Sequence, residues 1–166
     1  MLNLLRKSAA RRELGRALEH QVTERARAPV FFERLGVPDT MDGRFDLVAL
    51  HAWLALAALK NRGRDGDVQL LTDALFLGFD EALREQGVSD MGMGRRMKAI
   101  GNAFYGRLAA YGAAKNHAQL AEALARNVWR GEADPANSQA LANYVQSAQA
   151  ALTHPDTAGL DFGPLP

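Results

Sequence analysis

The longest apolar run in the chain lies between Leu47 and Leu59, and only His51 interrupts it. A membrane span needs about 20 apolar residues, so this run is too short to cross a bilayer. Leucine and alanine, two strong helix formers, dominate the run. Cations and a glycine follow it, as is common where a helix ends. We therefore predict a helix over residues 46–60 that is buried on nearly all sides and lies at the centre of the fold.

Helical periodicity continues on both sides of this segment. It is clearest over residues 91–111, where apolar residues recur at spacings of four, three, four, four and three. Turn-forming residues predict a loop over 36–43, and Asp67 is a suitable N-cap for the helix that follows the central one. No segment alternates in the manner of a strand, so the predicted fold class is all-α. The further helices are predicted over residues 1–27, 67–86, 91–111, 117–130 and 137–152.

The same patterns divide the chain into three parts. Residues 1–27 are predicted to form a basic N-terminal helical arm. Residues 28–152 are predicted to form a single compact helical domain around the central buried helix. Residues 153–166 are rich in proline and glycine, which predicts an extended tail.

The N-terminal arm carries many more cations than acids. We expect an uncleaved helix rather than a targeting peptide, because Glu13 and Glu19 interrupt the basic residues and no secretory signal is visible. One interpretation is a solvated helix that packs along one leucine edge. The other is an arm that rests on anionic lipid or ribosomal RNA. The cations are Arg6, Lys7, Arg11, Arg12, Arg16, Arg25 and Arg27.

Composition removes several classes of function. The chain has no cysteine, which excludes disulfides, thiolate metal sites and cysteine nucleophiles. Its 20 cations and 19 acids give a net charge of +1. The molecule as a whole is therefore not strongly attracted to nucleic acid or membrane, and local charge matters more.

Candidate catalytic chemistry is sparse. The four histidines include no pair at helical metal-ligand spacing. His51 lies inside the apolar helix and is the one histidine that could ligate haem or accept a proton, but we expect a core histidine that binds neither metal nor haem. No nucleophile motif or phosphate-binding loop is complete. We therefore predict no catalytic residue, no metal and no cofactor.

The helix predicted over 91–111 offers a binding surface instead. Its polar face carries cations and an aromatic residue, and no acid lies between Met91 and Asn116. Arginine and tyrosine are enriched at protein interfaces. The candidate partner-binding residues are Arg95, Arg96, Lys98, Asn102, Tyr105 and Arg107, with Asp73, Asp80, Glu81 and His51 as secondary candidates.

Three stretches resemble a known family in combination. They are Gly43–Lys60 (GRFDLVALHAWLALAALK), Leu70–Leu83 (LLTDALFLGFDEAL) and Met91–Tyr111 (MGMGRRMKAIGNAFYGRLAAY). Together with the lead-in LGVPDTMDGRFD over Leu35–Asp46 they are similar to the ubiquinol–cytochrome c chaperone family. The resemblance covers roughly residues 25–130.

This resemblance implies an all-α protein without catalytic activity that assists assembly of ubiquinol–cytochrome c reductase. Mitochondrial members of the family bind newly made cytochrome b as their client, near the ribosomal exit and with a small partner protein. The implied location is the cytoplasm, at the cytoplasmic face of the inner membrane, or the mitochondrial matrix in a eukaryote. We expect a peripheral protein without a transmembrane segment. A haem-handling protein or small helical enzyme that uses His51 and a ribosome- or RNA-binding helical module remain the alternatives.

Overall fold

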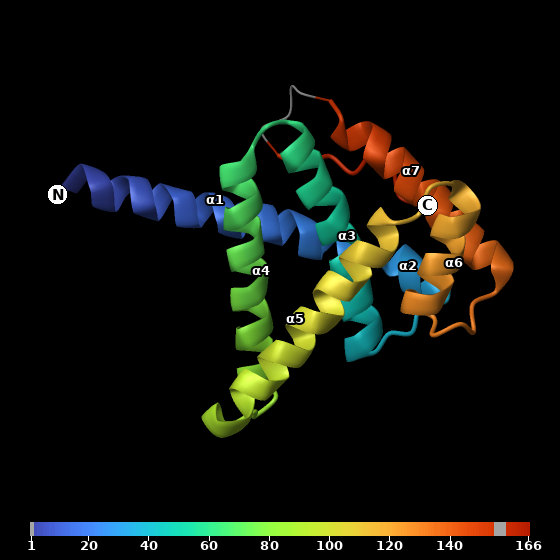
Figure 1. Ribbon diagram of the computed structural model, residues 1–166, viewed down its shortest axis with the longest axis horizontal. Helices are drawn as coiled ribbons and strands as arrows, with labels where there is room; N and C mark the ends of the chain where they lie inside the picture. Colours follow the sequence, from blue (N-terminus) through green and yellow to red (C-terminus); the bar gives the residue numbers. More distant parts are fainter. Residues whose placement is uncertain (1, 155–158) are drawn as a thin grey trace.

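The computed structural model describes residues 2–154 and 159–166, with side chains from residue 6 onward (Figure 1). The described residues form helices and connecting segments and contain no strand, so the predicted all-α class is confirmed. The helices are α1 (Leu2–Ala26), α2 (Pro29–Glu33), α3 (Met41–Asn61), α4 (Asp65–Glu85), α5 (Asp90–Gly112), α6 (His117–Val128) and α7 (Pro135–Leu152).

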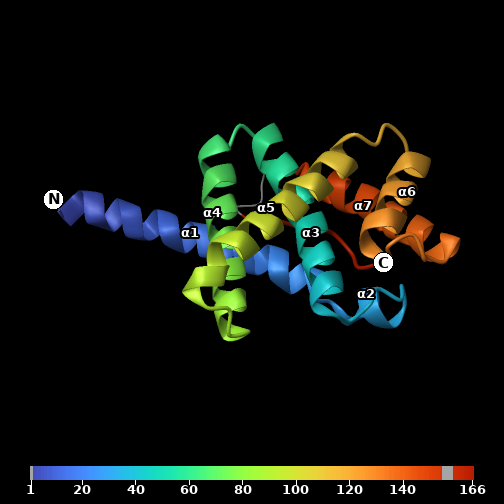
Figure 2. The ribbon, with the colours of Figure 1, turned by 60° about the horizontal axis from the view of Figure 1, so that its bottom comes forward.

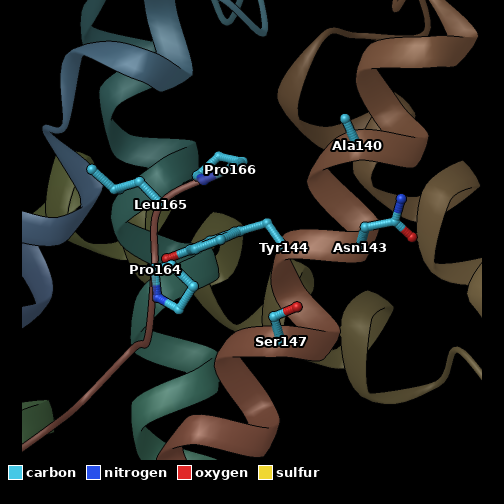
Figure 3. Close-up of a pocket in the computed structure, with 7 residues that line it drawn as sticks. All are labelled: Ala140, Asn143, Tyr144, Ser147, Pro164, Leu165 and Pro166. Carbon is cyan, nitrogen blue, oxygen red and sulfur yellow. The ribbon is translucent and has the colours of Figure 1, made fainter.

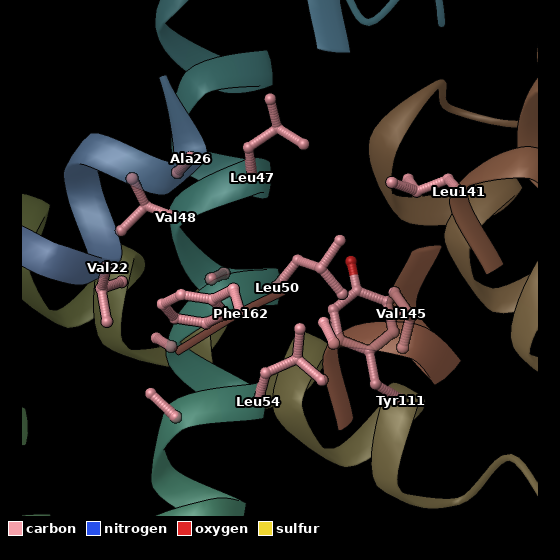
Figure 4. Close-up of a cluster of buried hydrophobic side chains, with 14 of the residues drawn as sticks. Val22, Ala26, Leu47, Val48, Leu50, Leu54, Tyr111, Leu141, Val145 and Phe162 are labelled. Carbon is pink, nitrogen blue, oxygen red and sulfur yellow. The ribbon is translucent and has the colours of Figure 1, made fainter. Parts of the chain in front are cut away.

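Helix α3 is the centre of the fold. It packs against α1, α4, α5, α6 and α7, and Figures 1 and 2 show it enclosed by these helices. The prediction of a buried helix here is confirmed: Leu50 and Leu54, for example, are 0% and 2% exposed. In Figure 4, Val22 of α1 lies on one side of α3, and Leu141 and Val145 of α7 lie on the other. The apolar run therefore forms the shared core of the surrounding helices.

The start of α3 depends on a glycine. The predicted loop over 36–43 is too long by three residues, because α3 begins at Met41. The Thr40 hydroxyl oxygen accepts a hydrogen bond from the Gly43 amide at 3.1 Å, which caps the helix. A Cβ atom added at Gly43 would lie 2.0 Å from the Pro38 carbonyl oxygen. The chain can thus turn this closely into α3 only because residue 43 has no side chain.

The start of α4 and the presence of α2 also differ from the prediction. Asp67 is not the N-cap of α4, because the helix begins at Asp65 with Arg64 at the cap position. Asp67 lies in the first turn and accepts a hydrogen bond from Arg64 Nε at 2.5 Å. The short helix α2, in which Phe31 is buried, was not among the predicted helices.

Helix α1 has a buried half and a projecting half. Leu18, Val22 and Ala26 are buried, and the helix packs against α4 and α3. The crossing with α4 is close at Gly15, where an added Cβ would lie 2.9 Å from the Leu70 carbonyl oxygen. Residues 6–13 are exposed throughout. Figures 1 and 2 show this end of α1 extending away from the other helices.

The described part of the C-terminal segment, residues 159–166, contains no helix and lies on the core. Leu160 and Phe162 are buried. One guanidinium nitrogen of Arg25, Nη2, donates to the carbonyl oxygens of Gly163 and Pro164 at 2.6 and 2.8 Å. The segment is therefore anchored to α1 by main-chain hydrogen bonds and by two apolar side chains. Residues 155–158 of the predicted tail lie outside the described residues.

Candidate functional site

Helix α5 separates an apolar face from a basic one, as its periodicity predicts. Met93, Phe104 and Tyr111 are buried, and the apolar positions between them are partly buried. The polar positions of the opposite face are exposed, and Tyr105 is 53% exposed. The ion pairs of the described residues leave out all three cations of this face. We define the α5 outer face by its exposed residues Arg95, Arg96, Lys98, Asn102 and Tyr105.

Arg107, the sixth predicted residue of this surface, points elsewhere. Its Nε donates to Asp46 Oδ1 at 2.5 Å, and its side chain is only 14% exposed. Its guanidinium carbon lies 5.0 Å from the centre of the Phe45 ring. Arg107 therefore joins α5 to α3, and it is a structural residue rather than part of the exposed surface.

Asp46 is the centre of a buried charge cluster. Its carboxylate is fully buried and also accepts a hydrogen bond from Arg130 Nη1 at 2.7 Å. Arg130 follows α6 and has a φ of +57°, a left-handed conformation that is unusual for a residue with a side chain. Burial raises the pKa of Asp46, and Arg107 and Arg130 oppose that rise. The ion pairs of this cluster connect α3 to α5 and to the residues that follow α6.

His51 belongs to a buried chain of hydrogen bonds. Its Nδ1 lies 2.8 Å from the Leu47 carbonyl oxygen, and its Nε2 lies 2.8 Å from the Tyr144 hydroxyl. A carbonyl can only accept, so Nδ1 carries the proton and Nε2 accepts from the hydroxyl. The same hydroxyl accepts from Arg25 Nε at 2.9 Å. Every polar atom of the imidazole thus has a partner in the neutral form.

This environment leaves His51 no evident role as a ligand. Burial lowers its pKa to about 4, and the nearby Arg25 charge acts in the same direction. Coordination of iron or zinc would break one of its two hydrogen bonds and expose a buried site. The described residues also contain no group of three acidic or histidine side chains that could hold a metal ion.

The acidic secondary candidates lie on α4. Asp73 and Glu81 are exposed, and Asp73 Oδ1 accepts from Gln69 Nε2 at 2.6 Å. Asp80 accepts from Arg84 Nε at 2.7 Å, so part of its charge is already matched. None of the three lines either of the cavities described below, and Asp80 is partly buried while the other two are exposed.

Helices α4 and α5 each carry exposed large apolar side chains. Met91 is 97% exposed and Leu77 is 47% exposed. The ring of Tyr105 stacks on Phe76 with centroids 5.9 Å apart. Methionine, tyrosine and arginine are the residue types enriched where proteins meet. Helix α5 therefore exposes residue types that are enriched in protein-binding surfaces.

The cavities of the described residues offer little chemistry. One of about 290 Å³ lies between α7 and the C-terminal segment, and Figure 3 shows Tyr144 crossing it toward Pro164. Tyr144 is its one titratable lining residue, and its hydroxyl is already committed to His51 and Arg25. Another of about 330 Å³ between α6 and α7 is lined by nine residues, which include four alanines, His117, Glu122 and Ser138. In the second cavity, the Ser138 hydroxyl donates to the Pro135 carbonyl oxygen at 3.1 Å, and His117 Nε2 lies 2.8 Å from Asn143 Oδ1. The serine and the histidine are thus each hydrogen-bonded to another group.

Among the helices of the described residues, none is both long enough and apolar enough to cross a membrane. Helix α3, which contains the longest apolar run, is instead the helix that the others cover.

Comparison with known proteins supports one family. The sequence profile described as ubiquinol-cytochrome C chaperone matches residues 33–163. The chain is 27% identical over 121 residues to ubiquinol-cytochrome-c reductase complex assembly factor 1 of Xenopus laevis, covering 70% of this chain and 60% of that protein. The human protein of that name is 28% identical over 121 residues, covering 70% of this chain and 40% of the relative. The chain thus spans less than two thirds of these relatives.

A solved structure resembles the whole fold. The crystal structure of the Cbp3 homolog from Brucella abortus superposes with a TM-score of 0.81 and 31% sequence identity, covering 97% of each chain. The profile match covers most of the sequence, and it includes α3, α5 and the buried charge cluster between them. The chain belongs to the ubiquinol–cytochrome c chaperone family.

Proposed function

We propose that this protein is a non-catalytic chaperone that binds newly made cytochrome b and promotes assembly of ubiquinol–cytochrome c reductase. The relatives are named as assembly factors of the reductase complex, which supports the role in assembly. The observation that carries the proposal is the α5 outer face, where cations and Tyr105 are exposed on one side of a helix whose other side is buried. The identification of cytochrome b as the specific client rests on the family resemblance.

Electrostatics explains how this face could hold a client. An exposed cation contributes little to the stability of its own fold, but complementary charge speeds encounter and selects the partner. The face contains no acid, and the exposed aromatic ring of Tyr105 provides apolar contact beside the charges. A polar, acidic segment of a membrane protein outside the bilayer would match these properties.

The proposal places the protein beside the membrane into which its client inserts. In a bacterium this is the cytoplasmic face of the inner membrane, and in a eukaryote it is the matrix. A contact with the ribosome and a small partner protein are further predictions of the resemblance. An enzymatic or haem-handling role for His51 is not proposed, because both nitrogens of its ring are already hydrogen-bonded.

The double variant Arg95→Glu/Lys98→Glu tests the proposal in a host that lacks the wild-type copy. We expect soluble, helical protein, because both residues are exposed. We also expect less accumulated cytochrome b, less reductase activity and less cytochrome b that co-purifies with a tagged chaperone.

The matched control is Lys115→Glu/Arg126→Glu, which reverses the same number of exposed cations away from the α5 outer face. This variant should support normal reductase levels. If both variants behave like wild type, the client surface is elsewhere, and Asp73, Asp80 and Glu81 on α4 are the next to change. If cytochrome b does not co-purify with wild type under conditions that preserve other partners, the proposed client is wrong.

A further inference from the structure

We propose that the N-terminal part of α1, residues 2–16, docks the protein on an anionic lipid surface. This element is distinct from the α5 outer face, and its role does not depend on the identity of the client. It contains five cations and one acid, whereas the whole chain contains 20 cations and 19 acids. The rest of the molecule therefore carries more acids than cations, and the positive charge is concentrated at one end.

The structure leaves these cations unused by the fold. Arg6, Lys7, Arg11, Arg12 and Arg16 are all exposed. None of them takes part in an ion pair within the described residues. Residues 2–13 extend about 18 Å at the usual helical rise, beyond the first buried position of α1. Figures 1 and 2 show no other helix beside this end.

Helical spacing indicates how the element would meet a surface. At about 100° per residue, the positions of the five cations are distributed around most of the helix circumference rather than along one stripe. A helix that lies flat in the interface needs a separate apolar face, which this segment lacks. The arrangement fits an approach by the end of the helix, with a ring of cations next to the lipid phosphates.

The first turn adds an apolar contribution. The sequence places Leu2, Leu4 and Leu5 immediately before the first cations. Stable membrane attachment needs two signals, such as an apolar group together with a basic cluster. Leucines that enter the headgroup region and cations that contact phosphates would supply both. The remainder of the molecule carries more acids than cations, so the same surface would attract it less than this element.

Lipid fits this element better than RNA. Binding to single-stranded RNA usually uses aromatic side chains on which bases stack, and residues 2–16 contain no aromatic residue. Three leucines within one helical turn would form no favourable contact with the charged backbone of RNA. They are suited to the interface of a bilayer.

The experiment is flotation of the full-length chain with vesicles of phosphatidylcholine alone or of phosphatidylcholine mixed with phosphatidylglycerol. We expect binding to the mixed vesicles only. Arg6→Gln/Lys7→Gln/Arg11→Gln should weaken that binding about 100-fold, since each cation near an anionic surface contributes about fivefold. The matched control Arg95→Gln/Arg96→Gln/Lys98→Gln removes the same charge from α5 and should bind within about fivefold of wild type. Equal losses in both variants would overturn the proposal.

A second variant separates lipid from RNA. Leu4→Gln/Leu5→Gln keeps every charge and should reduce binding to the mixed vesicles while leaving any binding to transfer RNA unchanged. Vesicle binding unaffected by this change, with transfer RNA bound more tightly than vesicles, would assign the element to RNA instead. Circular dichroism of the charge variants should match wild type, because the fold does not use these exposed cations.

Discussion

The hydroxyl of Tyr144 lies 2.8 Å from His51 Nε2, and this hydrogen bond connects the centre of α3 to α7. The histidine is fully buried, and the Tyr144 hydroxyl also accepts from Arg25 on α1. Three helices that are distant in the sequence thus share one chain of hydrogen bonds. The chain is satisfied only while the imidazole is neutral, since a proton on Nε2 would displace the one that Tyr144 donates.

The first prediction is a loss of stability in acid that depends on His51. Burial lowers the pKa of His51 from 6.5 to about 4 in the folded protein, so the unfolded state binds more protons between these values. The free energy of unfolding should therefore be unaffected by His51 above about pH 6.5 and should fall by about 3 kcal/mol as the pH approaches 4. Chemical denaturation across this pH range measures it.

The control for this prediction is His51→Gln. Glutamine can donate and accept hydrogen bonds but does not titrate, so the variant should lose part of the pH dependence while other groups keep theirs. It should be less stable than wild type at neutral pH. An unchanged slope of stability against pH in the variant would mean that His51 does not titrate on unfolding.

The second prediction separates Arg107 from its neighbours on α5. Arg107→Gln should destabilise the protein by about 3 kcal/mol, because it leaves the buried Asp46 carboxylate with Arg130 alone. Arg95→Gln should change the free energy of unfolding by less than about 0.5 kcal/mol, because its side chain is exposed. Urea denaturation of the two variants is the measurement. Equal effects would contradict the division of the basic residues into structural and exposed ones.

The pattern of apolar and polar residues in the sequence was sufficient to predict which residues of α3 and α5 are buried and which are exposed. The apolar run around Leu50 and Leu54 could be placed at the centre because a helix that is apolar on all sides must be covered on all sides. The burial of Phe104 and the exposure of Arg95 follow from one helical period. The burial or exposure of these residues depends only on residues within a few helical turns in the same segment. The sequence shows those residues directly.

Pairings between distant residues could not be predicted in this way. Asp46 is 61 residues from Arg107 and 84 from Arg130, and in the sequence it resembles an ordinary acidic residue at a helix start. The sequence alone therefore groups Arg107 with the exposed cations of α5. Likewise, His51 and Tyr144 are 93 residues apart. A polar residue within an apolar run indicates that a buried partner is needed, but it does not identify the partner.

The third prediction concerns the core of α3. Leu50→Ala and Leu54→Ala should each cost about 2–5 kcal/mol, the range for leucines whose removal leaves a cavity. Both side chains are buried between α3 and its neighbours. The midpoint of urea unfolding reports the loss. A cost below about 1 kcal/mol at both positions would be inconsistent with this central packing.

The fourth prediction is that alanine has opposite effects at two helical glycines. Gly106 is exposed on α5, and an added Cβ would meet no atom within 4 Å. Glycine inside a helix costs roughly 0.5–1 kcal/mol relative to alanine, so Gly106→Ala should stabilise the protein by about that amount. At Gly43 the added Cβ would lie 2.0 Å from the Pro38 carbonyl oxygen, so Gly43→Ala should destabilise by at least 1–3 kcal/mol, roughly the cost of overpacking.

The two glycine variants also test whether Gly106 matters for binding. Gly106 lies one helical turn from Asn102, on the outward side of α5. If a client helix approaches this side closely, Gly106→Ala should raise the melting temperature and yet reduce the amount of cytochrome b that co-purifies. Gly43→Ala should lower both, because it disturbs the start of α3 itself. A Gly106→Ala protein that is more stable and binds the client normally would mean that the contact is made by Arg95 and Lys98 without close packing at residue 106.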